Sequence, residues 1–285
     1  RGPLGAQYAF QHHGCAVMRG GVYSHTGRGT SLRQLLVLGK TLVLRDFRFR
    51  YRQAYFGYLW AVARPVVGVL PLILVGNAFQ LGGDMEAAEY ALFAMSGFLM
   101  WQMFWDGVIS PQWIARRVRR IFKEVPFSPE SLVAAGAGLV VFNALFYGVI
   151  FVIACLLTRT VPPPTLPLAL LALPFIVLGG LAIGAFFISL TFVYLDFRFG
   201  LPLLSPLLLW TAPIIYVTPE DGVLAVINRW NPLTYLINIP REWLISGLSG
   251  NDSLFLVCAL AFVVLFGVTL RFLQRSLPVA VQSLP

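Results

Sequence analysis

Long apolar runs separated by short polar segments dominate the chain. A transmembrane helix needs roughly 20 consecutive, mostly apolar residues, and six runs reach this length. The pattern therefore predicts an all-α integral membrane protein with six transmembrane helices, whose membrane domain covers residues 54–285. The six predicted spans are Tyr55–Phe79, Tyr90–Ile109, Leu132–Leu157, Leu168–Tyr194, Leu201–Val217 and Leu254–Phe272.

The fifth apolar run differs from the others because it is short and rich in proline. It contains Pro202, Pro206 and Pro213. A proline inside a helix removes a backbone hydrogen bond, and its ring clashes with the preceding turn. We therefore expect this span to be kinked or broken.

The segment Thr218–Asp252, between the fifth and sixth runs, is too long for a structureless loop in a compact protein. It contains two short amphipathic runs, Val223–Trp230 and Leu233–Leu244, on either side of Asn231-Pro232. Neither run is long enough to cross a bilayer. Because non-helical backbone at membrane depth must be buried or line water, the pattern predicts two re-entrant or interfacial helices near an outer opening.

An amphipathic segment precedes the first span. At 100° per residue, one side of residues 32–47 carries Leu32, Leu35, Leu36, Leu42 and Val43, and four cations cluster on the other side. The four cations are Arg33, Lys40, Arg45 and Arg48. This pattern predicts an interface helix over residues 32–53, serving either as a simple membrane anchor or as a lever against a cytoplasmic partner.

Residues 1–31 have no apolar run, which predicts a cytoplasmic tail without a signal peptide.

Composition agrees with a membrane protein. Of 285 residues, 58% are hydrophobic and only 12% are charged, whereas a soluble domain has about 25% charged residues. The formal net charge is +9, but the cations flank apolar runs instead of forming a nucleic-acid-binding face. One set of connecting segments holds fourteen Lys and Arg residues and the other holds three. The positive-inside rule then predicts that both termini are cytoplasmic.

The connection between the second and third spans, Ser110–Glu130, is the most basic in the chain. Its cations alternate with Trp113, Ile114 and other apolar residues at roughly helical spacing. This pattern favours a short docking helix for an acidic groove on another protein, although a plain positive-inside anchor is the alternative. The cations are Arg116, Arg117, Arg119, Arg120 and Lys123.

The chain shows no catalytic pattern. It has no Ser/His/Asp or Cys/His arrangement, no carboxylate cluster for acid–base chemistry and no complete nucleotide-binding loop. The three cysteines are scattered, which argues against a disulfide or a metal site. Within the predicted spans, Arg64 and Asp106 are ionisable, and both lie near span ends instead of in a midplane relay. We therefore expect a protein that is not an enzyme and holds no metal or cofactor.

Aromatic residues make up 14% of the chain. Phe98, Trp101 and Trp105 follow one another at helical spacing on one side of the second span, and Tyr55 and Tyr58 do the same at the start of the first. One interpretation is interfacial belts and ordinary packing. The other is a path lined by flat faces that suits sugar rings.

Small residues mark the fourth span. Gly180 and Gly184, with Gly179 beside them, lie on the predicted helix. Glycines at such spacing let the backbones of two membrane helices approach closely. We therefore expect a tight helix crossing at this point.

Four segments, in order along the chain, resemble a known family. They are RDFRFRYRQAYFGYLWAVARP (Arg45–Pro65), VPFSPESL (Val125–Leu132), LDFRFGLPLLSPLLLWTAPIIY (Leu195–Tyr216) and NPLTYLINIPREWL (Asn231–Leu244). Together they resemble the permease subunits of type-2 ABC exporters for O-antigen, capsular polysaccharide and teichoic acid. The likeness covers about Leu32 to Leu277.

The resemblance implies a homodimer in the bacterial inner membrane that works with two separate ABC ATPase subunits, which would bind ATP and Mg²⁺. It implies a coupling helix near Gln112–Lys123 and a second contact at Asp196–Gly200, including Asp196 and Arg198. The cargo would be a lipid-linked glycan, moved outward through an aromatic tunnel. Export of a drug, lipid or other small amphiphile is the alternative. The residues implied to line the tunnel are Tyr55, Tyr58, Phe98, Trp101, Trp105, Trp210 and Tyr216.

Overall fold

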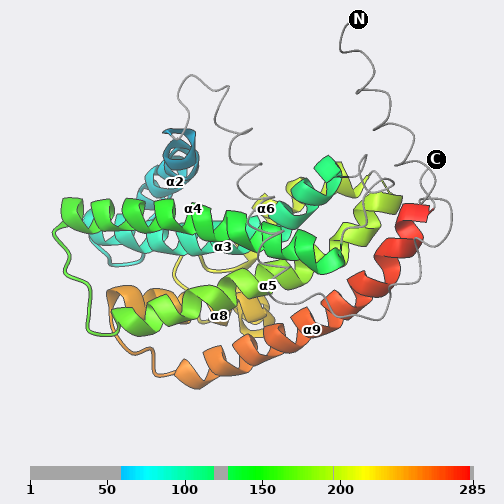
Figure 1. The fold of residues 1–285 in the computed structure, drawn as a ribbon. Coiled ribbons are helices and arrows are strands. Elements are labelled where there is room, and N and C mark those ends of the chain that lie inside the picture. The colour runs from blue at the N-terminus through cyan, green and yellow to red at the C-terminus, as the bar shows by residue number, and fades with distance from the viewer. Residues whose placement is uncertain (1–58, 119–127, 195, 283–285) are drawn as a thin grey trace, which may run out of the picture.

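The computed structural model describes residues 59–118, 128–194 and 196–282. These residues form eight helices, and no strand occurs within the described ranges (Figure 1). Several predictions lie outside the described residues. They are the tail, the interface helix with Arg33, Lys40, Arg45 and Arg48, the tyrosines Tyr55 and Tyr58, and the cations Arg119, Arg120 and Lys123.

Four of the helices in the described ranges are long and apolar enough to cross a membrane. They are α3 (Ala87–Val118), α4 (Pro129–Thr158), α5 (Leu166–Val193) and α9 (Asp252–Gln282). They correspond to the second, third, fourth and sixth predicted spans and extend along the long dimension of the molecule (Figure 1). Together with the composition, they make the chain an all-α, multi-pass membrane protein.

Two shorter helices stand at the first and fifth predicted spans. They are α2 (Leu59–Ala78) and α6 (Phe197–Thr211), and their apolar stretches are Pro65–Ala78 and Phe199–Thr211. Helix α6 ends two residues before Pro213, so the run is broken there as predicted. That α2 and α6 cross the membrane stays a prediction.

Helix α3 is the centre of the bundle. In its most apolar window 78% of the residues are buried, against 22–39% in the other three long helices. It packs against α2, α4, α5 and α8. By contrast, α4 and α9 expose large apolar side chains such as Leu156, Leu256 and Leu260, which suits faces covered by lipid or by a second copy of the chain.

The tight crossing predicted at Gly180 and Gly184 is confirmed, and its partner is α3. A Cβ atom at Gly180 would lie 2.0 Å from the carbonyl oxygen of Phe104, and one at Gly184 would lie 2.7 Å from that of Gly107. Gly107 in turn lies against the backbone of α5. The two helices therefore touch backbone to backbone, which only glycine permits.

The two short helices predicted between the fifth and sixth spans are present as α7 (Val223–Trp230) and α8 (Pro232–Ile245). Asn231 separates them and caps α8 by accepting a hydrogen bond from the Leu233 N–H at 3.0 Å. Helix α7 is mostly exposed, whereas α8 is buried against α3, α5 and α9. Whether this pair enters the membrane stays a prediction.

Two predicted segments differ in extent within the described residues. Residues 110–118 are helical, as the docking-helix pattern indicated, but they continue α3 instead of forming a separate helix. Residues 197–200, which precede the predicted fifth span, form the first turn of α6. Pro111 is tolerated inside α3 because its ring packs on Gly136 of α4. A Cβ atom added at Gly136 would lie 2.5 Å from the Cγ of Pro111. Ile114 and Ala115, beyond it, are buried. Apolar burial thus extends α3 past its proline, at the cost of one backbone hydrogen bond.

Candidate functional site

The broken segment after α6 is the most unusual part of the fold. Residues 212–216 are not helical, yet all five are buried. Buried carbonyl groups need hydrogen-bond donors, and side chains supply them here. The Arg241 Nη1 donates to the carbonyls of Pro213 and Ile214, both at 3.0 Å, and the Tyr90 hydroxyl donates to that of Ile215 at 2.6 Å.

Arg241 organises this region from α8. Arg241 is 3% exposed, and its guanidinium donates from Nη2 to Oδ1 of Asn238 at 2.9 Å and lies 3.7 Å from the ring centroid of Phe93. Burial lowers the pKa of Arg241 to about 9, and the nearby Glu242 opposes this shift. Arg241 therefore remains protonated at neutral pH and joins α8, α3 and the broken segment through one charged group.

From the sequence, Arg241 was only one of the polar residues within the short amphipathic run Leu233–Leu244. Its anchoring role depends on contacts with residues 27 and 28 positions away, which no local pattern reveals. A signal was nevertheless present. A cation in an otherwise apolar segment is costly to bury unless it is paired, and Asn238 precedes it by three residues, on the same face of the helix.

Other polar side chains hold α6, α7 and α8 together. The Tyr216 hydroxyl lies 3.1 Å from Oδ1 of Asn228 and 3.1 Å from the carbonyl oxygen of Trp210, and its single hydrogen is shared between these two acceptors. The Asn231 amide donates to the carbonyl of Thr211 at 3.1 Å. With Arg241 and Asn238, these residues form a network that we call the α6–α8 polar network. It fixes the position of α7 and α8 relative to the bundle.

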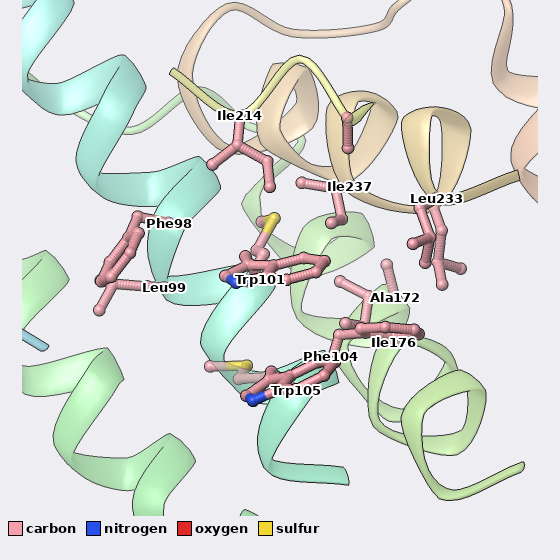
Figure 2. Packing of buried hydrophobic residues seen from close by; sticks show 14 of the residues in the cluster. Phe98, Leu99, Trp101, Phe104, Trp105, Ala172, Ile176, Ile214, Leu233 and Ile237 are labelled. Atoms are coloured by element: carbon pink, nitrogen blue, oxygen red, sulfur yellow. The ribbon is translucent and has the colours of Figure 1, made fainter. Parts of the chain in front are cut away.

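The aromatic residues of α3 form a buried stack. The rings of Trp101 and Trp105 lie 5.8 Å apart at an interplanar angle of 15°, and Trp101 also stacks on Phe104 at 5.7 Å. Figure 2 shows Trp101 near Ile214 and Ile237, with Phe104 and Trp105 one turn further along α3. The stack thus fills the space between α3, α8 and the broken segment.

This placement bears on the predicted tunnel lining. Phe98, Trp101, Trp105 and Tyr216 are each at most 9% exposed, whereas Trp210 on α6 is 46% exposed. The four buried rings pack in the core of this chain, as the packing interpretation expected. A lining role for them stays a prediction, and Trp210 is the member of the described set that is accessible.

The basic end of α3 carries an exposed aromatic residue. Trp113 is 47% exposed, and the guanidinium carbons of Arg116 and Arg117 lie 4.8 and 5.9 Å from its ring centroid. Such cation–π contacts hold cations over a flat apolar face. Of the second predicted contact, Asp196 is exposed just before α6, and Arg198 belongs to the first turn of that helix.

Asp106 is a carboxylate inside the bundle, 7% exposed. Its Oδ2 accepts hydrogen bonds from the Asn143 amide at 2.8 Å and the Tyr147 hydroxyl at 2.7 Å, both on α4. The sequence analysis placed Asp106 near the end of a span. Because α3 continues to Val118, Asp106 instead lies well inside the helix. Its partners are the kind that buried membrane carboxylates need, and they join α3 to α4.

No metal-binding set is present in the described ranges. There, no three His, Cys, Asp or Glu side chains come together. Cys155 on α4 is buried and Cys258 on α9 is partly buried, and neither forms a disulfide. The described residues therefore offer packing and hydrogen bonding, and no metal-ligand set.

Comparison with known proteins gives one local similarity to report. A stretch of 60 residues is 32% identical to the O-antigen export system permease protein RfbA of Klebsiella pneumoniae. The match covers 21% of this chain and 22% of the relative, so less than a quarter of either protein is aligned. No known family's sequence profile matches the chain.

Proposed function

We propose that this chain is the transmembrane permease subunit of an ABC exporter that moves a lipid-linked polysaccharide across the bacterial inner membrane. The observation that carries the proposal is the 60-residue similarity to an O-antigen export permease. The long apolar helices and the α7–α8 pair before the last span are compatible with it. In this proposal the chain acts as a homodimer and has no ATPase site of its own.

Two ABC ATPase subunits would bind ATP and Mg²⁺ and dock on the cytoplasmic side. The exposed Trp113, with the Arg116 and Arg117 guanidinium groups over its ring, is the described surface that fits this role. An apolar ring beside cations suits an acidic groove with an apolar floor. Asp196 and Arg198 at the start of α6 would form the smaller contact.

Purification from the native membrane tests the assignment. The chain should bring down an ABC ATPase, and native mass spectrometry should find two copies of each polypeptide. Transport of glycan by the chain alone, without nucleotide, would contradict the proposal, and so would a purified chain with no ATPase bound.

Charge reversal at the basic end of α3 tests the coupling role. In the reconstituted complex, Arg116→Glu combined with Arg117→Glu should lower ATP-dependent export at least about tenfold, because like charges at an interface cost several kcal/mol and each 1.4 kcal/mol is tenfold. The measurement is glycan export into vesicles beside phosphate release. ATP hydrolysis should become independent of substrate.

The control for this experiment makes the same charge change elsewhere. Arg271 and Arg275 are exposed near the end of α9, and Arg271→Glu with Arg275→Glu should leave coupling within twofold or so of the parent, since surface substitutions cost about 0.5 kcal/mol or less. If both double variants lose export equally, the effect is general and the docking role is wrong.

The second candidate cargo is a drug, lipid or other small amphiphile. Burial of Phe98, Trp101 and Trp105 favours it, because an aromatic tunnel is the feature expected for sugar rings. Export of long glycans by the reconstituted complex would decide for the first cargo. Transport of short amphiphiles alone would decide for the second.

A further inference from the structure

The turn that ends α2 bonds directly to the chain beyond the broken segment. Helix α2 closes with a Schellman motif, in which the Leu81 N–H donates to the carbonyl of Gly76 at 2.9 Å and the Gln80 N–H donates to that of Asn77 at 3.3 Å. Gln80 takes the left-handed conformation that this motif requires, with φ of 52°. The carbonyl of Leu81 then accepts from the Val217 N–H at 3.1 Å. The turn after α2 and the residue after the broken segment are therefore joined backbone to backbone.

Tyr90, in the first turn of α3, fills the space between this turn and the broken segment. It is 1% exposed, and its hydroxyl donates to the carbonyl of Ile215 at 2.6 Å. Its ring lies against two glycines, Gly76 on α2 and Gly82 just after it, and a Cβ atom at either position would overlap the phenol. Only glycine at both positions leaves room for the ring. Tyr90 thus contacts the α2 turn with its ring and the broken segment with its hydroxyl.

The side of α3 that carries Tyr90 is shaped to receive the broken segment. Tyr90, Phe93 and Gly97 lie on this side at i, i+3 and i+7. The rings of Tyr90 and Phe93 stack with centroids 6.3 Å apart, and the Arg241 guanidinium lies over Phe93. A Cβ atom at Gly97 would lie 2.8 Å from the carbonyl oxygen of Ile214. The broken segment therefore packs directly on the start of α3, opposite the turn that ends α2.

The contacts on the two sides of Tyr90 depend on each other. The ring is enclosed by the α2 turn on one side and by the broken segment on the other, so it cannot leave its position while both stay closed. Without its hydroxyl bond, the Ile215 carbonyl would be buried and would lack this donor, which is costly. Packed interiors have few voids and transmit strain. A displacement at the end of α2 should therefore reach the broken segment.

We propose that Tyr90 is a clamp that makes the end of α2 and the broken segment open and close as one unit. Tyr90 acts as a positioning residue, because it holds two pieces of backbone in place. The first and fifth predicted spans end in these two segments, so their ends stay together whenever either span moves. The inference goes beyond the proposed function and holds for any cargo.

Amide hydrogen exchange on the full chain in lipid nanodiscs, followed by mass spectrometry, tests the clamp. Tyr90→Phe removes the hydroxyl and keeps the ring. In this variant the peptides that contain Leu81 and Val217 should both exchange at least about fivefold faster, because the Ile215 carbonyl loses its donor and the clamp opens more often. Peptides from α9 should exchange as in the parent, which a general loss of stability would not allow.

Tyr147→Phe is the matched control for this variant. The Tyr147 hydroxyl is also buried and donates at 2.7 Å, but its acceptor is Asp106, on a different part of α3. Removing it takes away a hydrogen bond of the same kind without touching the clamp. Exchange at Leu81 and Val217 should stay as in the parent.

Gly76→Ala approaches the clamp from α2. Alanine is favoured over glycine inside helices, but here its methyl group would overlap the Tyr90 phenol. The substitution should therefore speed exchange at Val217, far along the chain, although it adds a good helix former to α2. Gly148→Ala on α4, where no atom lies within 4 Å of the new Cβ, should leave exchange at Val217 unchanged.

The parent gives a reading that needs no substitution. In mixed detergent micelles with increasing SDS, the peptides that contain Leu81 and Val217 should lose protection over the same range, because segments of one cooperative unit open together. Loss of protection at different SDS concentrations would overturn the clamp. Faster exchange at only one segment or at neither in Tyr90→Phe would do the same, and so would faster exchange at both in Tyr147→Phe.

These outcomes are separate from the test of the proposed function, because no ATPase or glycan takes part. A chain that recruits an ATPase and exports glycan while the two segments exchange independently keeps the function and loses the clamp. A chain whose segments open together but which binds no ATPase keeps the clamp and loses the function.

Discussion

Gly180→Ala should destabilise the folded chain by at least about 3 kcal/mol, although it adds a single methyl group. The new Cβ would lie 2.0 Å from the Phe104 carbonyl oxygen, and Gly107 of α3 is also in contact with Gly180. Overpacking usually costs about 1–3 kcal/mol, and here the obstructing atoms are backbone and cannot rotate away. The two helices must separate. Unfolding by SDS titration, followed by circular dichroism, measures the loss.

A second glycine provides the matched control for this substitution. Gly148 on α4 is exposed, and no atom lies within 4 Å of the position its Cβ would take. Alanine is favoured over glycine inside helices by up to about 1 kcal/mol, so Gly148→Ala should be neutral or stabilising. Opposite signs for the two substitutions are the expected result. If Gly180→Ala behaves like Gly148→Ala, the close crossing of α3 and α5 is wrong.

Arg241→Met should cost about 3–5 kcal/mol of folding free energy. Methionine has a similar length but no donors, so the carbonyls of Pro213 and Ile214 and the Oδ1 of Asn238 would each lose a hydrogen bond inside the protein. Each unpaired buried acceptor costs about 1–3 kcal/mol. The same SDS titration reads this loss.

Two comparison variants separate the hydrogen bonds of Arg241 from its charge. Arg241→Lys keeps the charge, but its ammonium lacks the planar fork that reaches three acceptors, so part of the stability should be lost. Arg229→Met removes an exposed cation on α7 and should change stability by less than about 0.5 kcal/mol. Equal losses in Arg229→Met and Arg241→Met would show that the anchoring role is wrong.

The fate of the broken segment explains why Arg241 matters for any transport role. Buried, non-helical backbone is tolerated in a membrane protein only where other groups satisfy it. Here a guanidinium from α8 and a tyrosine from α3 do so. A movement of α8 would therefore displace the segment that follows α6. Asn238, which accepts a hydrogen bond from Arg241, also lines a pocket beside α7 and α8.

Some boundaries were predicted closely and others were not. Helices α4, α5 and α9 appear where the apolar runs lie, and α7 and α8 flank the Asn231-Pro232 pair as expected. The second predicted span ends at Ile109, where the apolar run gives way to a basic segment, whereas α3 continues to Val118. Contacts between Pro111 and Gly136 of α4, far along the chain, bury this part of the helix. Apolar spacing predicts a helix but does not reveal which neighbour will bury its end.

The aromatic residues of α3 also show that spacing along the chain does not reveal which segment packs against a helix face. Helical spacing correctly placed Phe98, Trp101 and Trp105 on one side of a helix, and the rings of Trp101 and Trp105 do stack. Spacing could not say what lies opposite that side. The structure puts α8 and the broken segment there, so the rings are buried.

The amino-acid sequence by itself determined the membrane class, the helical content and the close crossing at Gly180, because apolar length and residue size are local properties of the chain. Only the tertiary structure decided that Arg241 and Asp106 each find hydrogen-bond partners on other segments. It also decided that the aromatic stack is enclosed and that Asn228 and Thr234 line one pocket. These facts depend on which distant segments meet. The physical reason is that burial and hydrogen-bond pairing belong to pairs of segments, while hydropathy belongs to each residue alone.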